Sequence, residues 1–173
     1  MQRITVVGSP GAGKSTFART LAGKLDLPLI HLDAEYWRSG WVEPPPAEWQ
    51  AKLETLIAHE SWVIDGNYGS SMDRRLARAD TAIWLDYPTR VSLARAIGRV
   101  WRHRGRTRPD MAEGCVERFD LAFLRYIASF RRMKRPAIVR RLKAFTGTVV
   151  QLRTPAEADR WLAACLGAEA PRG

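Results

Sequence analysis

The chain has 173 residues, 46% of them hydrophobic and 27% charged, which fits one folded domain with a substantial core. Its apolar runs are too short to cross a membrane, and Gly8 interrupts the first of them, so we expect neither a membrane span nor a signal peptide. The two cysteines, Cys115 and Cys165, are far apart, which excludes a disulfide framework and predicts a cytoplasmic protein.

The net charge of +10 is unevenly distributed along the chain. The stretch from Arg95 to Lys143 holds 15 Lys or Arg and four acids, a balance of +11, whereas the rest of the chain carries −1. An anion is therefore the expected partner of this stretch. The phosphates of a nucleotide and the phosphates of nucleic acid both qualify.

Short apolar runs alternate with amphipathic stretches from the N-terminus onward. Buried strands are predicted at residues 4–7, 29–32, 62–64, 82–85 and 149–152. Helices are predicted at 14–25, 49–57, 91–101, 116–130 and from 155 onward. This alternation predicts an α/β protein of three layers, with a parallel, doubly wound sheet of about five strands. With no repeat or linker, residues 1–173 are predicted to form a single domain.

The clearest motif follows the first predicted strand and opens the first predicted helix. Residues 8–15 read GSPGAGKS and fit the pattern GxxxxGK[ST] at every fixed position. Glycines let backbone N–H groups approach phosphate oxygens closely. The residues predicted to bind ATP here are Gly8, Ser9, Gly11, Ala12, Gly13, Lys14, Ser15 and Thr16. Lys14 is expected to reach the β- and γ-phosphates, and the Ser15 hydroxyl to bind Mg²⁺.

Two aspartates follow the second and third predicted strands. Asp33 and Asp65 both stand at carboxyl ends of strands, where open parallel sheets bind their ligands. Each carboxylate could bind Mg²⁺ or accept a proton from an attacking hydroxyl, and the sequence leaves open which does which. Each could instead cap a helix or form a turn.

Five arginines cluster in a segment rich in turn formers: Arg99, Arg102, Arg104, Arg106 and Arg108. Guanidinium groups stabilise the charge of a phosphoryl group in transfer. We therefore predict a lid near residues 99–118, with Arg102, Arg106 and Arg108 as catalytic residues. The alternative is a solvated basic surface.

Aromatic residues fall into two groups. Tyr36, Trp37 and Trp41 follow Asp33 without clear periodicity and could line an acceptor pocket, or pack beneath a loop. Trp101 lies on the apolar face of a predicted helix and is expected in the core.

Three strings together resemble a bacterial family known as DNA topology modulation proteins. They are IHLD at 30–33, WVIDGNY at 62–68 and RGRTRPDM at 104–111. That family is similar to adenylate kinase and to other P-loop kinases of the nucleoside monophosphate kinase type. The likeness extends from residue 1 to about residue 166 and implies a kinase core with a lid and an acceptor site.

The resemblance also bears on particular residues. Asp65-Gly66 stands where adenylate kinases carry Asp-Gly before Phe-Pro-Arg, but Asn67-Tyr68-Gly69 follows here, which speaks against AMP as the acceptor. Arg108-Pro109 resembles the lid arginine and proline of shikimate kinases, although their glycine-rich acceptor motif is missing. By the same likeness, Arg153 would border the adenine.

The sequence thus predicts a kinase that uses ATP and Mg²⁺ and phosphorylates a small-molecule or nucleotide acceptor. One alternative is a nucleic-acid-binding P-loop ATPase or polynucleotide kinase that affects DNA topology. Another is an ATP-dependent switch that acts through a partner. The family name concerns a phenotype and does not establish DNA binding.

Overall fold

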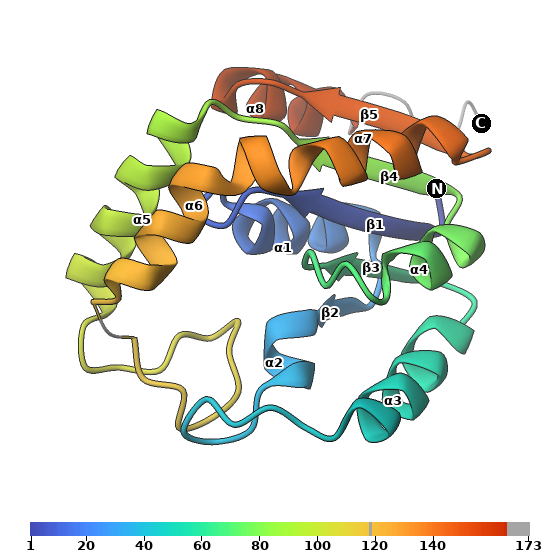
Figure 1. Cartoon of the computed structure of the whole chain (residues 1–173). Coiled ribbons are helices and arrows are strands. Elements are labelled where there is room, and N and C mark those ends of the chain that lie inside the picture. The colour runs from blue at the N-terminus through green and yellow to red at the C-terminus, as the bar shows by residue number, and fades with distance from the viewer. Residues whose placement is uncertain (118, 166–173) are drawn as a thin grey trace.

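The computed structural model describes residues 1–117 and 119–165, and a five-stranded sheet forms its centre (Figure 1). The strands are β1 (Arg3–Gly8), β2 (Leu29–His31), β3 (Trp62–Asp65), β4 (Thr81–Leu85) and β5 (Thr148–Leu152). They lie in the order β2-β3-β1-β4-β5, and all four neighbouring pairs are parallel. The predicted three-layer α/β fold with a parallel sheet is confirmed.

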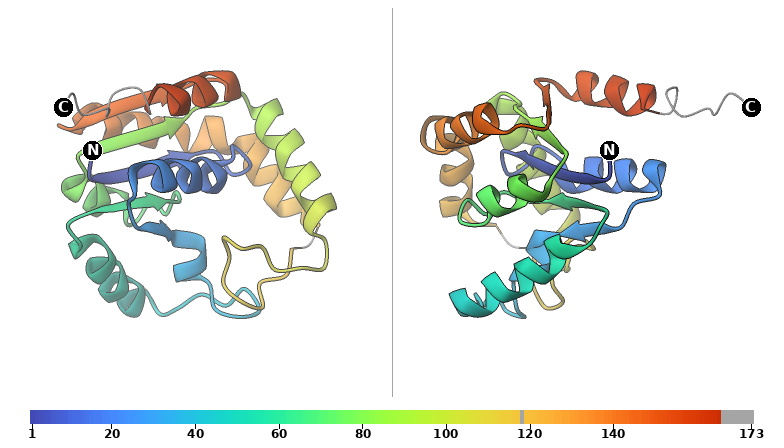
Figure 2. Two further views of the ribbon diagram at one scale, coloured as in Figure 1. Left: turned by 180° about the vertical axis from the view of Figure 1, so that it is seen from behind. Right: turned by 90° about the vertical axis from the view of Figure 1, so that its right-hand side faces the viewer.

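Helices cover both faces of this sheet (Figures 1 and 2). The helices are α1 (Lys14–Leu25), α2 (Leu32–Tyr36), α3 (Pro46–Ala58), α4 (Met72–Arg78), α5 (Thr89–His103), α6 (Leu121–Met133), α7 (Arg135–Ala144) and α8 (Pro155–Ala164). α1 and α8 pack on one face, and α4, α6 and α7 pack on the other. None of the helices in the described ranges is long and apolar enough to cross a membrane.

The strands have apolar side chains on both faces, because each face carries a layer of helices. In β1, Val6 packs toward α1 and α8, whereas Val7 packs toward α4, α6 and α7. Successive side chains of a strand point to opposite faces, so a continuous apolar run suits this position. A third cluster joins α3 to β3 through Trp49, Leu53 and Trp62.

The parallel arrangement brings the carboxyl ends of the strands to one edge. Asp65 is paired with Val6 of β1 on one side and with His31 of β2 on the other. The loop after β1 and the turn after β3 therefore leave the sheet next to each other. This edge is where open parallel sheets bind ligands.

Several local predictions were wrong. β2 ends at His31, and Asp33 lies in the first turn of α2 instead of ending a strand. Trp101 is 81% exposed and does not belong to the core. The helix predicted from residue 116 begins at 121, because the Asp120 side chain accepts the N–H groups of the first turn and caps the helix there. α2, α4 and α7 were not predicted.

Candidate active site

The loop that joins β1 to α1 lets an anion approach its backbone closely. Gly8, Gly11 and Gly13 have φ angles of 153°, 80° and 89°, which residues with a Cβ rarely adopt. A Cβ at Gly11 would lie 2.3 Å from the Ser92 carbonyl oxygen, so glycine is required there. α1 begins at Lys14 with no side-chain cap, so its first N–H groups can bind phosphate oxygens.

The Lys14 ammonium lies against this loop. It donates hydrogen bonds to the carbonyl oxygens of Gly8 (3.1 Å) and Ser9 (3.2 Å). Burial lowers the pKa of Lys14, and the negative charges of Asp33 and Asp65 oppose that decrease. The ammonium is therefore placed among carbonyls and carboxylates at a point where a phosphate would further stabilise its charge.

The remaining loop residues differ in their exposure. Ser9 and Ala12 are buried, and the Ser9 hydroxyl donates to the Pro10 carbonyl over 3.2 Å. Thr16 is exposed on the first turn of α1. From α5, Arg95 Nη1 donates to the Ala12 carbonyl over 2.9 Å, so this helix braces the loop from outside.

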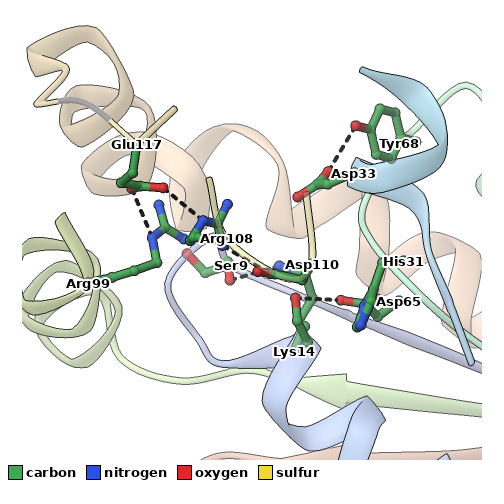
Figure 3. A network of polar contacts seen from close by, with 11 residues as sticks. Ser9, Lys14, His31, Asp33, Asp65, Tyr68, Arg99, Arg108, Asp110 and Glu117 are labelled. Atoms are coloured by element: carbon green, nitrogen blue, oxygen red, sulfur yellow. Dashed lines mark hydrogen bonds and ion pairs between the residues drawn. The ribbon is translucent and has the colours of Figure 1, made fainter. Parts of the chain in front are cut away.

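Asp65, the last residue of β3, has two partners. The Ser15 hydroxyl donates to Asp65 Oδ2 over 2.9 Å, and His31 Nδ1 bonds to Asp65 Oδ1 (Figure 3). Burial would lower the pKa of His31, but the hydrogen bond and the charge of Asp65 raise it above its ordinary value. The structure thus brings together Ser15 and Asp65, two of the three residues predicted to bind a metal, whereas the third, Asp33, bonds to Tyr68.

Asp33 lies nearby on α2. Tyr68, from the turn after β3, donates its hydroxyl to Asp33 Oδ1 over 2.8 Å. Burial raises the pKa of Asp33, while the charge of Lys14 and the Tyr68 hydrogen bond act in the opposite direction. A carboxylate with a raised pKa near the ammonium of Lys14 has the properties of a general base.

The turn after β3 is fixed from two sides. The Gly8 N–H donates to Asn67 Oδ1 over 3.1 Å, which joins the turn to the phosphate loop. Arg75 of α4 is fully buried, and its Nη1 donates to Thr5 Oγ1 and the Gly66 carbonyl, both at 3.0 Å. Its Nη2 donates to the Asn67 carbonyl over 2.7 Å. Arg75 therefore holds the turn that carries Tyr68.

The lid loop, residues 104–117, brings a basic and acidic cluster to the phosphate loop (Figure 3). Arg99, near the end of α5, donates from Nε to Glu117 Oε1 over 3.1 Å. Arg108 Nη1 donates to Asp110 Oδ2 over 2.9 Å. Arg108 Nε also lies 2.8 Å from Glu117 Oε2, an ion pair without an aligned hydrogen bond.

The other predicted arginines are at the surface. Arg102 and Arg106 are exposed, and Arg102 Nε donates to the Gly98 carbonyl in its own helix. Arg153 is exposed before α8, where its backbone N–H donates to Glu157 Oε2 over 2.7 Å. Of the three predicted lid arginines, the structure therefore places Arg108 in the cluster with the phosphate loop.

Aromatic rings form a wall beside Asp33. The ring centroid of Tyr36 lies 4.7 Å from that of Tyr68 and 5.0 Å from that of Trp49. Tyr36 and Trp37 line a cavity of about 110 Å³ between α2 and α3. Trp41 packs edge-on against Trp37 at 5.5 Å, and its indole N–H donates to the Val116 carbonyl of the lid loop.

The residues present fit ATP and Mg²⁺. The glycine backbone, the uncapped α1 and Lys14 together suit a chain of phosphates. Ser15 and Asp65 offer hard oxygen ligands 2.9 Å apart. Residues 1–117 and 119–165 hold no cluster of three or more His, Cys, Asp or Glu for a metal. Mg²⁺ bound jointly by one or two side chains, water and phosphates needs no such cluster.

Sequence reasoning missed Arg75, Asp110 and Glu117 as site residues. A signal existed for the two acids, because they are two of only four in the basic stretch from Arg95 to Lys143. Carboxylates in such surroundings are expected to pair with arginines. Arg75 has no comparable signal, since its role depends on the path of the backbone after β3.

Comparisons with known proteins identify relatives of this chain. The family described as "ATPase family associated with various cellular activities (AAA)" matches residues 4–64. The chain is 30% identical over 126 residues to shikimate kinase of Rhodococcus jostii (strain RHA1). The aligned segment covers 65% of this chain and 71% of that protein.

Solved structures show the same fold. Shikimate kinase from Acinetobacter baumannii, in complex with shikimate, has a TM-score of 0.60 at 16% identity, over 98% of this chain and 96% of that one. Shikimate kinase from Bacteroides thetaiotaomicron has a TM-score of 0.58 at 16% identity, over 96% of each chain. With the phosphate loop, the strand order and the relative from Rhodococcus, these findings place the chain in the shikimate kinase-like family of P-loop kinases, as an ATP-dependent phosphotransferase.

Proposed function

We propose that the protein uses Mg²⁺ and transfers the γ-phosphate of ATP to a hydroxyl group of a small-molecule or nucleotide acceptor. The observation that carries this proposal is the position of Asp33, which accepts a hydrogen bond from Tyr68 and lies near enough to Lys14 for its negative charge to oppose the decrease that burial causes in the pKa of that ammonium. A proton acceptor therefore stands beside the group that binds the phosphates. This arrangement suits transfer to a hydroxyl.

In this proposal the nucleotide lies along the phosphate loop. The backbone N–H groups of residues 8–16 and the Lys14 ammonium bind the phosphates. Arg153, before α8, borders the adenine. Arg108 of the lid loop approaches the γ-phosphate and stabilises the negative charge that spreads over its oxygens during transfer.

We assign different roles to the two aspartates. Asp65 binds the Ser15 hydroxyl, so this pair holds Mg²⁺, directly or through water. Bound there, the ion would neutralise charge on the β- and γ-phosphates. Asp33 binds Tyr68 instead of Ser15, which leaves its second oxygen for the acceptor.

The chemical step then follows from these positions. As the acceptor oxygen forms a bond to the γ-phosphorus, its proton passes to Asp33. The bond between that phosphorus and the β–γ bridging oxygen breaks, and ADP leaves with the electron pair. Asp33 later releases the proton to solvent. Closure of the lid loop over the site would exclude water and favour transfer over hydrolysis.

Tyr68, whose hydroxyl bonds to Asp33, packs against Tyr36, which packs against Trp37, and these rings support an acceptor with a flat or ring-shaped body. Two classes are the first to test. Shikimate is named with the relatives, and nucleosides present a primary hydroxyl next to an aromatic ring.

The test is a screen with radiolabelled ATP and Mg²⁺ against shikimate, nucleosides, nucleoside monophosphates and other small hydroxylated metabolites. Asp33→Asn should lose roughly 10²-fold or more in transfer rate while still binding ATP. Asp26→Asn, at an exposed carboxylate after α1, is the matched control and should keep the wild-type rate. An unchanged rate in Asp33→Asn would remove this residue from the mechanism.

The nucleic-acid alternative and the DNA topology modulation resemblance remain predictions, and the basic stretch gives them little support. Four of its arginines pair with buried carboxylates, Arg99 and Arg108 with Glu117 and Arg131 and Arg135 with Asp86, whereas others, such as Arg102 and Arg106, are exposed. Nanomolar, sequence-selective DNA binding at physiological salt would favour that alternative.

A further inference from the structure

Glu117 lies between two arginines at the lid loop (Figure 3). Its side chain is 6% exposed, and its two oxygens contact Arg99 and Arg108 separately, at 3.1 and 2.8 Å. The backbone around it is also tied down. The Glu117 N–H donates to the Arg106 carbonyl over 3.0 Å, and its carbonyl accepts from the Gly105 N–H over 3.2 Å. Glu117 is therefore held in place in the lid loop by contacts of both its side chain and its backbone.

The two guanidinium groups would repel each other without this carboxylate. Burial lowers the pKa of Arg99, and the positive charge of Arg108 lowers it further, whereas Glu117 raises it. Two neighbouring guanidinium groups form a good phosphate site only when another group, such as a carboxylate, offsets their repulsion and keeps them close together. Glu117, which contacts both guanidinium groups, holds them together here.

Asp110 contacts the same guanidinium from the opposite direction. It accepts a hydrogen bond from Arg108 Nη1. Burial would raise the pKa of Asp110, but the charge of Arg108 lowers it below its ordinary value. Its carboxylate therefore occupies the lid arginine that a phosphate bound by the loop would also need.

We propose that the two carboxylates have opposite effects on phosphate binding. Glu117 is a positioning residue that holds Arg99 and Arg108 together for the phosphates. Asp110 is an internal anion that occupies Arg108 until a phosphate replaces it. Asp110 is the carboxylate that is displaced, because among the described residues it pairs with one arginine, whereas Glu117 pairs with two. This inference rests on the proposed binding of ATP at the phosphate loop.

The experiment measures affinity by titration calorimetry without Mg²⁺, first for ATP and then for inorganic triphosphate. Glu117→Gln should weaken binding about tenfold, because an uncharged amide no longer holds two guanidinium groups. Asp110→Asn should tighten binding severalfold, because a competing negative charge is removed. Glu113→Gln removes the same charge from an exposed position of the lid loop and is the control.

The possible outcomes distinguish a failure of the proposed function from a failure of this inference. If the wild-type protein binds neither ATP nor triphosphate, the proposed function and this inference both fail. If the wild type binds and Asp110→Asn weakens affinity or leaves it unchanged, the inference alone is overturned. An unchanged affinity in a folded Glu117→Gln variant also overturns it. Should Glu117→Gln unfold, the sign of the Asp110→Asn effect decides. Equal shifts with ATP and triphosphate are expected, and a shift with ATP alone contradicts a role at the phosphates.

Discussion

The hydroxyl of Tyr68 donates a 2.8 Å hydrogen bond to Asp33 Oδ1, which joins the turn after β3 to the helix after β2. Burial raises the pKa of both groups. The hydrogen bond favours the ionised carboxylate and so limits the rise at Asp33. Tyr68 therefore controls the pH range over which Asp33 can accept a proton.

Removing this hydrogen bond should shift the pH dependence of the reaction. In Tyr68→Phe the pKa of Asp33 rises further, because burial remains and a donor is lost. A base must be deprotonated, so activity falls as the pH drops through its pKa. We expect the acid limb of the kcat profile to move to higher pH, with little change well above it. If the acid limb of Tyr68→Phe lies at the same pH as that of the wild type, Asp33 is not the titrating group.

Lys14→Met tests the phosphate loop. Methionine keeps a similar chain length but removes the ammonium that lies against the loop carbonyls. ATP affinity should fall by at least about tenfold, the order expected for a charge-assisted hydrogen bond. Calorimetric titration of both proteins gives the answer. Lys24→Met, at the far end of α1, is a suitable control, and equal affinity of Lys14→Met and wild type would contradict the proposed nucleotide site.

Asp65→Asn should separate metal binding from nucleotide binding. An amide is a weaker Mg²⁺ ligand than a carboxylate, although it can still accept from Ser15. Affinity for ATP with Mg²⁺ should drop about tenfold, while affinity for ATP in chelator changes far less. Asp73→Asn, at a carboxylate whose side chain is 67% exposed, should alter neither value. A parallel loss with and without Mg²⁺ would assign Asp65 a role unrelated to the ion.

Arg75→Met addresses stability. The three hydrogen bonds of Arg75 go to buried or half-buried oxygens of Thr5, Gly66 and Asn67. Loss of the donor leaves these oxygens unsatisfied, which should cost about 3 kcal/mol in the free energy of unfolding. Arg74→Met, next to it in α4, removes an exposed ion pair with Glu54. That control should change stability by less than about 1 kcal/mol. Denaturant unfolding of both variants provides the comparison.

The sheet and the phosphate loop could be predicted because their signals are local. Buried strands appear as short apolar runs, and the glycine motif has fixed spacing that its chemistry requires. The positions of Asp65 and Lys14 followed from those two signals. The start of α6 could not be found the same way, since residues 116 and 119 continue the helical spacing by chance while lying exposed before the helix.

The contacts within the site depend on long-range geometry. Glu117 meets Arg99 across 18 residues, and Tyr68 meets Asp33 across 35. Nothing in the spacing of these residues indicates the contacts, because the strand order and the path of the lid loop create them. The five lid arginines look equivalent in sequence for the same reason. Only the structure separates Arg108, held over the phosphate loop, from Arg106 at the surface.

Trp41 links the region beyond α2 to the lid loop, and this link can be tested. Its φ of 66° is unfavourable for a residue with a side chain. Its indole N–H donates to the Val116 carbonyl over 3.2 Å, next to Glu117. Trp41→Phe keeps an aromatic ring against Trp37 but removes the donor. The lid loop should then open more often, so limited proteolysis there should be severalfold faster without nucleotide.

The control for this change is Trp101→Phe, the same substitution at a side chain that is 81% exposed. It should leave the rate of cleavage in the lid loop unchanged. ATP should slow cleavage in all three proteins, because Arg108 gains phosphate partners that do not depend on Trp41. If Trp41→Phe and wild type are cleaved equally fast without ATP, the hydrogen bond to Val116 does not restrain the lid loop.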